Sequence, residues 1–137
     1  MANALYTTLK NNMLTQAATQ VDFDADDIRA ILVDNGAYTV NLATHDFLDD
    51  VAGGARIATA ALTGESVTTN VFDANDVTFT AVTGTSVESI VIYKHTGTES
   101  TSRLIAYIDT ATNLPVTPNG GDIVVAWDNG ASKILAL

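Results

Sequence analysis

The stretch IRAILVD, residues 28 to 34, marks the point at which the chain changes from a helical to a strand pattern. Its middle positions are apolar on both faces of an extended segment, whereas a half-exposed strand would alternate apolar and polar residues. Strands that are apolar on both faces are typical of the centre of a sheet. The stretch therefore predicts a central β-strand.

Further strand patterns follow along the chain. VTFTAV (77–82) alternates cleanly, with Val77, Phe79 and Ala81 on one face, as a half-buried antiparallel strand does. Three segments are apolar on both faces in their middles and are expected to be central strands: ESIVIYKH (88–95), SRLIAYID (102–109) and DIVVAWD (122–128). About eight strands result when three more segments are added: RIATAAL (56–62), SVTTNVF (66–72) and ASKILAL (131–137).

One turn is predicted from its residue pair alone. Asn129-Gly130 lies between the segments 122–128 and 131–137. Asn-Gly is the preferred pair for a two-residue β-hairpin, because both turn positions need a positive φ. We therefore expect a final hairpin at the C-terminal end.

The N-terminal residues carry the only helical pattern. Leu5, Leu9, Met13 and Ala17 recur every four residues, which predicts a short amphipathic helix from Asn3 to Ala17 with Asn3 as its cap. A helix packed on the core and a docking arm for a partner would both produce this pattern.

Length and composition indicate one globular domain. The chain has 137 residues, of which 47% are hydrophobic and 16% charged. Together with the patterns above, this predicts a mainly β fold, a single antiparallel β-sandwich spanning residues 1–137, with 1–20 as an N-terminal helical segment.

Charge and hydropathy exclude several classes of partner. Six basic and sixteen acidic residues give a net charge of -10, which would repel both nucleic acid and an anionic membrane. No apolar stretch approaches the roughly 18 residues that span a bilayer. The N-terminus does not have the pattern of a signal peptide, so we expect a soluble protein that folds in the cytoplasm. There are no cysteines, so its contacts are expected to be non-covalent.

The acidic run DFDADD (22–27) is the densest group of potential metal ligands. Asp22, Asp24 and Asp26 match the first three ligand positions of a calcium loop. The loop also needs glycine at its sixth position and glutamate at its twelfth, where this chain has Asp27 and Val33. In an extended segment the three aspartates would share a face, so a loose site completed by other loops stays open as an alternative. The sequence favours a solvated, charged start to the strand, with no metal or cofactor.

No catalytic residues are predicted. His45 and Asp46 are neighbours, but no serine lies in the G-x-S-x-G elbow of a hydrolase. The run HDFLDD (45–50) is better interpreted as a short helical turn with Phe47 and Leu48 buried and its acids in water. An enzyme is therefore not expected.

Two longer runs resemble a known family. They are YTVNLATHDFLDDVAGGARIATA (38–60) and VIYKHTGTESTSRLIAYIDTATNLPVTPNGGDIVVAWDNG (91–130). Together they resemble the capsid cement, or decoration, proteins of tailed bacteriophages, a family of small virion structural proteins. The resemblance implies a jelly-roll-like β-sandwich that binds the outer surface of the phage head. Such a protein is made in the host cytoplasm and cements neighbouring major capsid protein subunits, and the family has no active-site residues to carry over.

The few basic residues are candidates for orienting such contacts. Arg29, Arg56, Lys94 and Arg103 are scarce positive charges in an acidic chain, and a charge at the rim of an interface can set orientation and association rate. Ordinary surface solvation is the competing interpretation of each. Self-association about a capsid symmetry axis would let a small oligomer grip several subunits, with a homodimer favoured over a homotrimer.

Two other classes of function stay open. A neck, baseplate or tail-fibre component of the same virion would have a similar composition. A carbohydrate-binding β-sandwich would instead need exposed aromatic platforms beside acids, for example Tyr38 or Tyr93 near Asp46.

Overall fold

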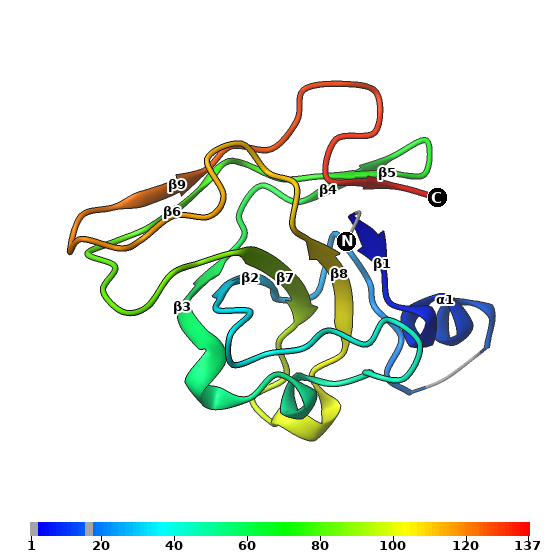
Figure 1. Ribbon diagram of the computed structural model, residues 1–137. Helices are drawn as coiled ribbons and strands as arrows, with labels where there is room; N and C mark the ends of the chain where they lie inside the picture. Colours follow the sequence, from blue (N-terminus) through cyan, green and yellow to red (C-terminus); the bar gives the residue numbers. More distant parts are fainter. Residues whose placement is uncertain (1–2, 16–17) are drawn as a thin grey trace.

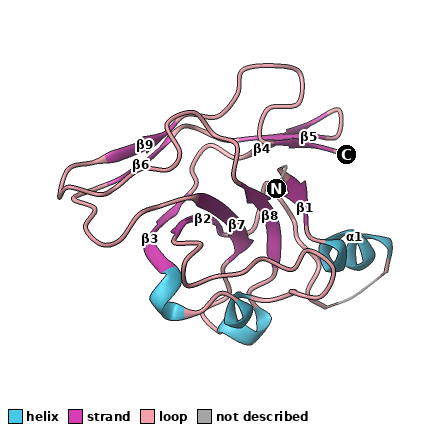
Figure 2. Cartoon of the chain, viewed as in Figure 1, coloured by secondary structure: helices cyan, strands magenta, loops and turns pink. Residues whose placement is uncertain are grey.

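The computed structural model describes residues 3–15 and 18–137 (Figures 1 and 2). Most of the regular structure is strand, the pairings between the named strands are antiparallel, and there is one short α-helix, which confirms the mainly β prediction. The strands are β1 (Ala4–Leu5), β2 (Ile28–Val33), β3 (Arg56–Ala61), β4 (Ser66–Thr68), β5 (Val71–Asp73), β6 (Val77–Phe79), β7 (Ser89–Lys94), β8 (Leu104–Ile108), β9 (Ile123–Val125) and β10 (Leu135–Ala136). The helices are α1 (Thr7–Leu14) and the 3-10 turns η1 (Leu48–Asp50), η2 (Gly53–Ala55) and η3 (Glu99–Thr101).

β2 is an interior strand of the largest sheet, as predicted for residues 28–34. The five strands of this sheet lie in the order β1-β8-β7-β2-β3, so β2 has a partner on each side. Leu32 of β2 lies opposite Ile90 of β7 and Ala58 of β3. The interior strands of this sheet lie in residues 28–34, 88–95 and 102–109, as predicted. Their side chains can be covered on both faces of the sheet, which explains why these segments are apolar throughout.

Two smaller sheets form a second layer on one side of the five-stranded sheet (Figure 1). One has three strands in the order β10-β5-β4, and the other pairs β6 with β9. The arrangement is sandwich-like. Phe72 of β5 is buried and packs against Phe23, with ring centroids 5.1 Å apart. Trp127, just after β9, donates from its backbone N–H to Asp76 Oδ1 and from Nε1–H to the Asn75 carbonyl, both at 3.0 Å.

The segment 66–72, predicted as one strand, is a hairpin instead. Thr69 and Asn70 have φ values of 51° and 57°, and the chain reverses there from β4 to β5. Two successive residues with positive φ make the type of turn whose twist suits a two-residue hairpin. Asparagine tolerates a positive φ, but the β-branched threonine disfavours it. The sequence therefore did not predict a turn at Thr69 and Asn70.

The predicted C-terminal hairpin is wrong. β9 pairs with β6, whereas β10 pairs with β5 in the other small sheet. The turn between them falls at residues 130–133, where Lys133 N–H donates to the Gly130 carbonyl. The local preference of Asn-Gly is outweighed by burial of Leu135 opposite Phe72. The segment 122–128 is likewise not a central strand, since Val124 is 61% exposed.

The predicted faces of VTFTAV hold only in part. Val77 and Phe79 are buried and the threonines between and after them are exposed, as expected. Ala81 has a φ of 49°, which breaks the alternation. Val82 is consequently buried and Ala81 exposed, the reverse of the prediction.

The N-terminal helix is shorter than predicted. It covers Thr7–Leu14, and its cap position is Tyr6 rather than Asn3. The Asn3 side chain instead accepts backbone hydrogen bonds from Asp109 and Thr110 through Oδ1, at 3.0 and 3.2 Å. Leu9 is fully buried, so the helix packs on the core. The predicted end at Ala17 lies outside the described residues. Among those described, no helix has both the length and the apolar character to cross a membrane.

The central position of β2 generates a stability prediction. Ile31 is fully buried, so Ile31→Ala should lower the free energy of unfolding by about 2 to 5 kcal/mol through lost burial and the cavity left behind. The exposed Val124→Ala change serves as the control and should cost less than about 1 kcal/mol. Urea denaturation of both variants measures the difference, and equal losses would contradict the assignment of β2 as the core strand.

Candidate partner-binding surface

Two of the four predicted partner-binding cations bind the acidic run 22–27. Arg29 binds Asp27 through Nη2 and Nε, at 2.7 and 3.1 Å, and the pKa of Asp27 is lowered, chiefly by this hydrogen bonding. Lys94 Nζ lies 2.9 Å from Asp26 Oδ2 and donates to the Gln20 carbonyl at 2.8 Å. Arg29 of β2 and Lys94 of β7 thus hold the turn at residues 22–27, which precedes β2.

Of the other two predicted cations, Arg56 lies opposite Val33 at the far end of β2, whereas Arg103 precedes β8 and accepts at its backbone carbonyl from Lys94 N–H at 2.9 Å. Arg56 binds both carboxylate oxygens of Glu99, at 2.7 and 3.1 Å, and donates to the backbone carbonyls of Leu48 and Val51. Arg103 is only 7% exposed. Its guanidinium lies 4.4 Å from the ring centroid of Phe47 and donates to Thr19 Oγ1. The four side chains do not form one patch, and each has an intramolecular partner. That they contact a partner protein stays a prediction.

The run DFDADD is a turn and not the extended segment assumed for a shared aspartate face. The backbone N–H groups of Ala25 and Asp26 donate to the Asp22 carbonyl, and Asp22 N–H donates to Asp26 Oδ2 at 2.7 Å. A hydrogen bond with Asp24 is the main cause of the raised pKa of the Asp22 carboxyl. Over residues 3–15 and 18–137, no group of three or more histidine and acidic side chains is placed to hold a metal ion.

The run HDFLDD contains η1, so the predicted helical turn is confirmed. Leu48 is buried, whereas Phe47 is half-buried beneath Arg103. His45, at the start of the run, ends a hydrogen-bonded chain that the sequence did not predict. Tyr6 Oη lies 2.9 Å from Tyr38 Oη, which in turn lies 2.9 Å from His45 Nδ1.

The tyrosines of this chain are core residues. Burial is the main cause of the raised pKa of both Tyr6 and Tyr38, and the pKa of Tyr38 reaches about 12. Tyr38 is 4% exposed and Tyr93 3% exposed. The two aromatic platforms suggested for a carbohydrate site are therefore not on the surface.

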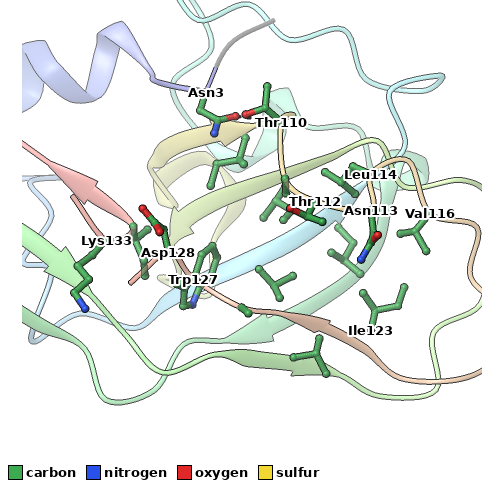
Figure 3. A pocket seen from close by; sticks show the side chains of 18 of the residues that line it. Asn3, Thr110, Thr112, Asn113, Leu114, Val116, Ile123, Trp127, Asp128 and Lys133 are labelled. Carbon is green, nitrogen blue, oxygen red and sulfur yellow. Dashed lines mark hydrogen bonds between the residues drawn. The ribbon is translucent and has the colours of Figure 1, made fainter. Parts of the chain in front are cut away.

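A cleft lies between the five-stranded sheet and β9 (Figure 3). Its volume is about 680 Å³, within the usual size range of ligand pockets. Leu32, Ile90 and Ile108 form its floor, one from each of three neighbouring strands. Its walls are the chain from Asp122 to Asp128 and the loop 110–114. Sequence reasoning missed the cleft, because it arises from the distance between layers rather than from any motif.

The outer surface is dominated by acids. Sixteen acidic residues face six basic ones, of which Arg29, Arg56, Lys94 and Lys133 are ion-paired within the chain and Arg103 is buried. Internal pairing neutralises one acid for each cation that it uses. A large negative excess therefore remains for an interaction at the surface.

No protein-family model matches the chain, and a search of curated protein sequences found no match. The fold and the surface described above therefore carry the functional argument.

The Arg29–Asp27 pair generates a prediction about acid titration. Because Asp27 has a lowered folded-state pKa, the pair stabilises the fold above the unfolded pKa, and this is lost as pH falls through the folded pKa. Arg29→Gln should raise the pKa of Asp27 towards its ordinary value, measured by carbon NMR of the carboxyl groups. Arg56→Gln is the matched control: it should raise the pKa of Glu99, which Arg56 lowers, and leave Asp27 unchanged.

The geometry of residues 22–27 generates a prediction about calcium. Asp26 and Asp27 are engaged by Lys94 and Arg29, so we expect calcium to leave the melting temperature unchanged. An ion present at 100 times its dissociation constant would add about 2.7 kcal/mol, or roughly 10 °C in a domain of this size. Thermal denaturation with calcium, with magnesium and with chelator is the measurement. A rise specific to calcium that Asp24→Asn removes would contradict the expectation.

Proposed function

We propose that this protein is a virion structural protein that binds the outer surface of a tailed-phage head and cements neighbouring major capsid protein subunits. The observation that carries the proposal is the negative excess left at the surface once five of the six basic side chains are paired or buried within the chain. The family resemblance of residues 38–60 and 91–130 supports the same function. The jelly-roll connectivity implied by that resemblance is part of the proposal.

The charge distribution suits a protein that stays apart from its own copies until it meets a shell. Copies with a net charge of -10 repel one another in solution and are attracted by a basic region on a capsid subunit. This attraction accelerates association and fixes orientation, and it weakens as salt screens the charges. The negative charge of the protein also disfavours binding of nucleic acid or of an anionic membrane.

Exposed strand edges supply a second means of attachment. β4 lies at one edge of the three-stranded sheet, and β9 has a partner on one side only. An unpaired edge offers a row of backbone donors and acceptors to a strand of another chain. In the assembled state a homodimer, or alternatively a homotrimer, would multiply such small contacts over the shell.

The proposal is tested by adding the purified protein to phage heads that lack it. We expect saturation at a copy number in proportion to the capsid subunits, and heads that withstand higher temperature before they open. Binding should weaken between low and high salt, because part of the attraction is between exposed charges. Occupancy is measured by quantitative gel analysis, and its location by electron microscopy of labelled protein.

Two outcomes would contradict this function. One is the absence of binding to heads at any salt concentration. The other is saturation at a handful of copies at the tail vertex, which would favour a neck or tail component of the virion.

A further inference from the structure

The cleft between β9 and the five-stranded sheet is bordered by a strand edge. The residues from Asp122 to Asp128 all line it, although β9 covers only Ile123–Val125 and burial alternates from residue to residue along the whole stretch. Ile123 and Val125 lie opposite the buried Phe79 and Val77, whereas Val124 lies opposite the exposed Thr78. Side chains of both faces can line one cleft only if the backbone edge itself faces it. Because β6 covers the other edge, this edge of β9 has no strand beside it among the described strands.

The floor of the cleft is apolar, whereas Thr110, Thr112 and Asn113 add polar side chains to its walls. Its floor of Leu32, Ile90 and Ile108 is continued by Ile123 and Leu114 on the walls (Figure 3). Leu32 and Ile90 are buried, but Ile108, Leu114 and Ile123 keep part of their surface in water. Apolar side chains inserted above them would gain burial without displacing any part of the fold.

The two ends of this edge are acidic. Asp122 precedes β9 and Asp128 follows Trp127, and both are exposed. An extended stretch of this length spans roughly 20 Å. Asp122 and Asp128 lie two and four positions from the exposed Val124. In an extended chain, residues an even number of positions apart share a face, so both belong to the outward face. Lys133 also lines the cleft, but its Nζ lies 3.7 Å from Asp73 Oδ2, so it is ion-paired within the chain.

We propose that the cleft binds an extended segment of a partner protein, which pairs with the free edge of β9 and carries a basic residue at each end. Opposite residues 122–128, such a segment has seven positions. Its second, fourth and sixth side chains point inward over the apolar floor, and its first and seventh reach Asp122 and Asp128. The pattern required is a basic residue, five residues with apolar side chains at alternate positions, and a second basic residue. Charge complementarity favours this partner over a second copy of the chain, whose net charge is -10.

This inference rests on the proposed function for the source of the segment, a major capsid protein subunit. The chemistry of the cleft, however, can be tested without any phage head. The probe is the capped peptide KVTVTVK, whose pattern is the same in both strand directions. The control EVTVTVE reverses its terminal charges, and KTVTVTK turns its apolar residues to the outward face.

The experiment is an NMR titration of the isotope-labelled protein. We expect KVTVTVK to shift the backbone amides of residues 122–128 and 110–116, and to bind at least about tenfold more tightly than either control peptide. Asp122→Asn with Asp128→Asn should reduce binding of KVTVTVK to the level of EVTVTVE. Asparagine can still accept the hydrogen bond that Ala81 N–H donates to Asp122 Oδ1. Asp49→Asn on η1 removes one acid elsewhere and should leave binding unchanged.

Several outcomes would overturn the inference. They are shifts confined to other residues, equal binding of the charge-reversed peptide, and shifts of residues 122–128 that depend on protein concentration alone, which would indicate a second copy in the cleft. Adding the double variant to heads separates the two proposals. Heads that bind the wild type and the double variant equally would overturn the cleft as the capsid contact and leave the proposed function standing. Peptide binding without any binding to heads would support the cleft chemistry and overturn the proposed function.

Discussion

The fold depends on the pairing of β2 with β3 on one side and with β7 on the other. Five of the six residues of β2 are buried, so the strand needs a cover on each face of its sheet as well as a neighbour on each edge. One face turns towards β9 and the small sheets, as the position of Leu32 and Ile90 in the cleft floor shows. The other face carries Ile31, Val91 and Tyr107 in adjacent register. Asn35 donates to Tyr107 Oη from the chain that follows β2, so local segments rather than a second sheet contribute to this side.

Several of the few basic residues hold loops against this sheet. Lys94 and Arg29 hold the turn 22–27 before β2, and Arg56 joins η1 and η3 through backbone carbonyls and Glu99. Exposed ion pairs of this kind each contribute little to stability. Their larger effect is on the surface, because each pair uses one of the few basic residues and most of the sixteen acids remain. The sequence has only six basic residues, and for that reason we predicted that these cations contact a partner. The structure shows that they clamp loops within the chain.

The central strands could be predicted from the sequence because their pattern is set by burial on both faces, which does not depend on the details of the turns. The hairpin at Thr69 and Asn70 could not, since threonine there adopts a conformation that its own preferences disfavour. The Asn129-Gly130 prediction failed because a local turn preference is worth less than seating Leu135 beside Phe72. The cleft and the pairs Lys94–Asp26 and Arg56–Glu99 join residues far apart in the chain. Residue spacing carries no information about such distances, so these features had to come from the structure.

The hydrogen-bonded chain from Tyr6 to His45 has a direction. The backbone N–H of Asn41 donates to His45 Nδ1 at 3.3 Å, and a backbone amide can only donate. Nδ1 is therefore the bare nitrogen of the ring, and a neutral His45 is the tautomer with its proton on Nε2. Tyr38 must then donate to His45, which leaves its oxygen to accept from Tyr6. One half-buried ring thus sets the orientation of two hydroxyl groups inside the core, and Tyr38, which both donates and accepts, is the residue through which that orientation passes.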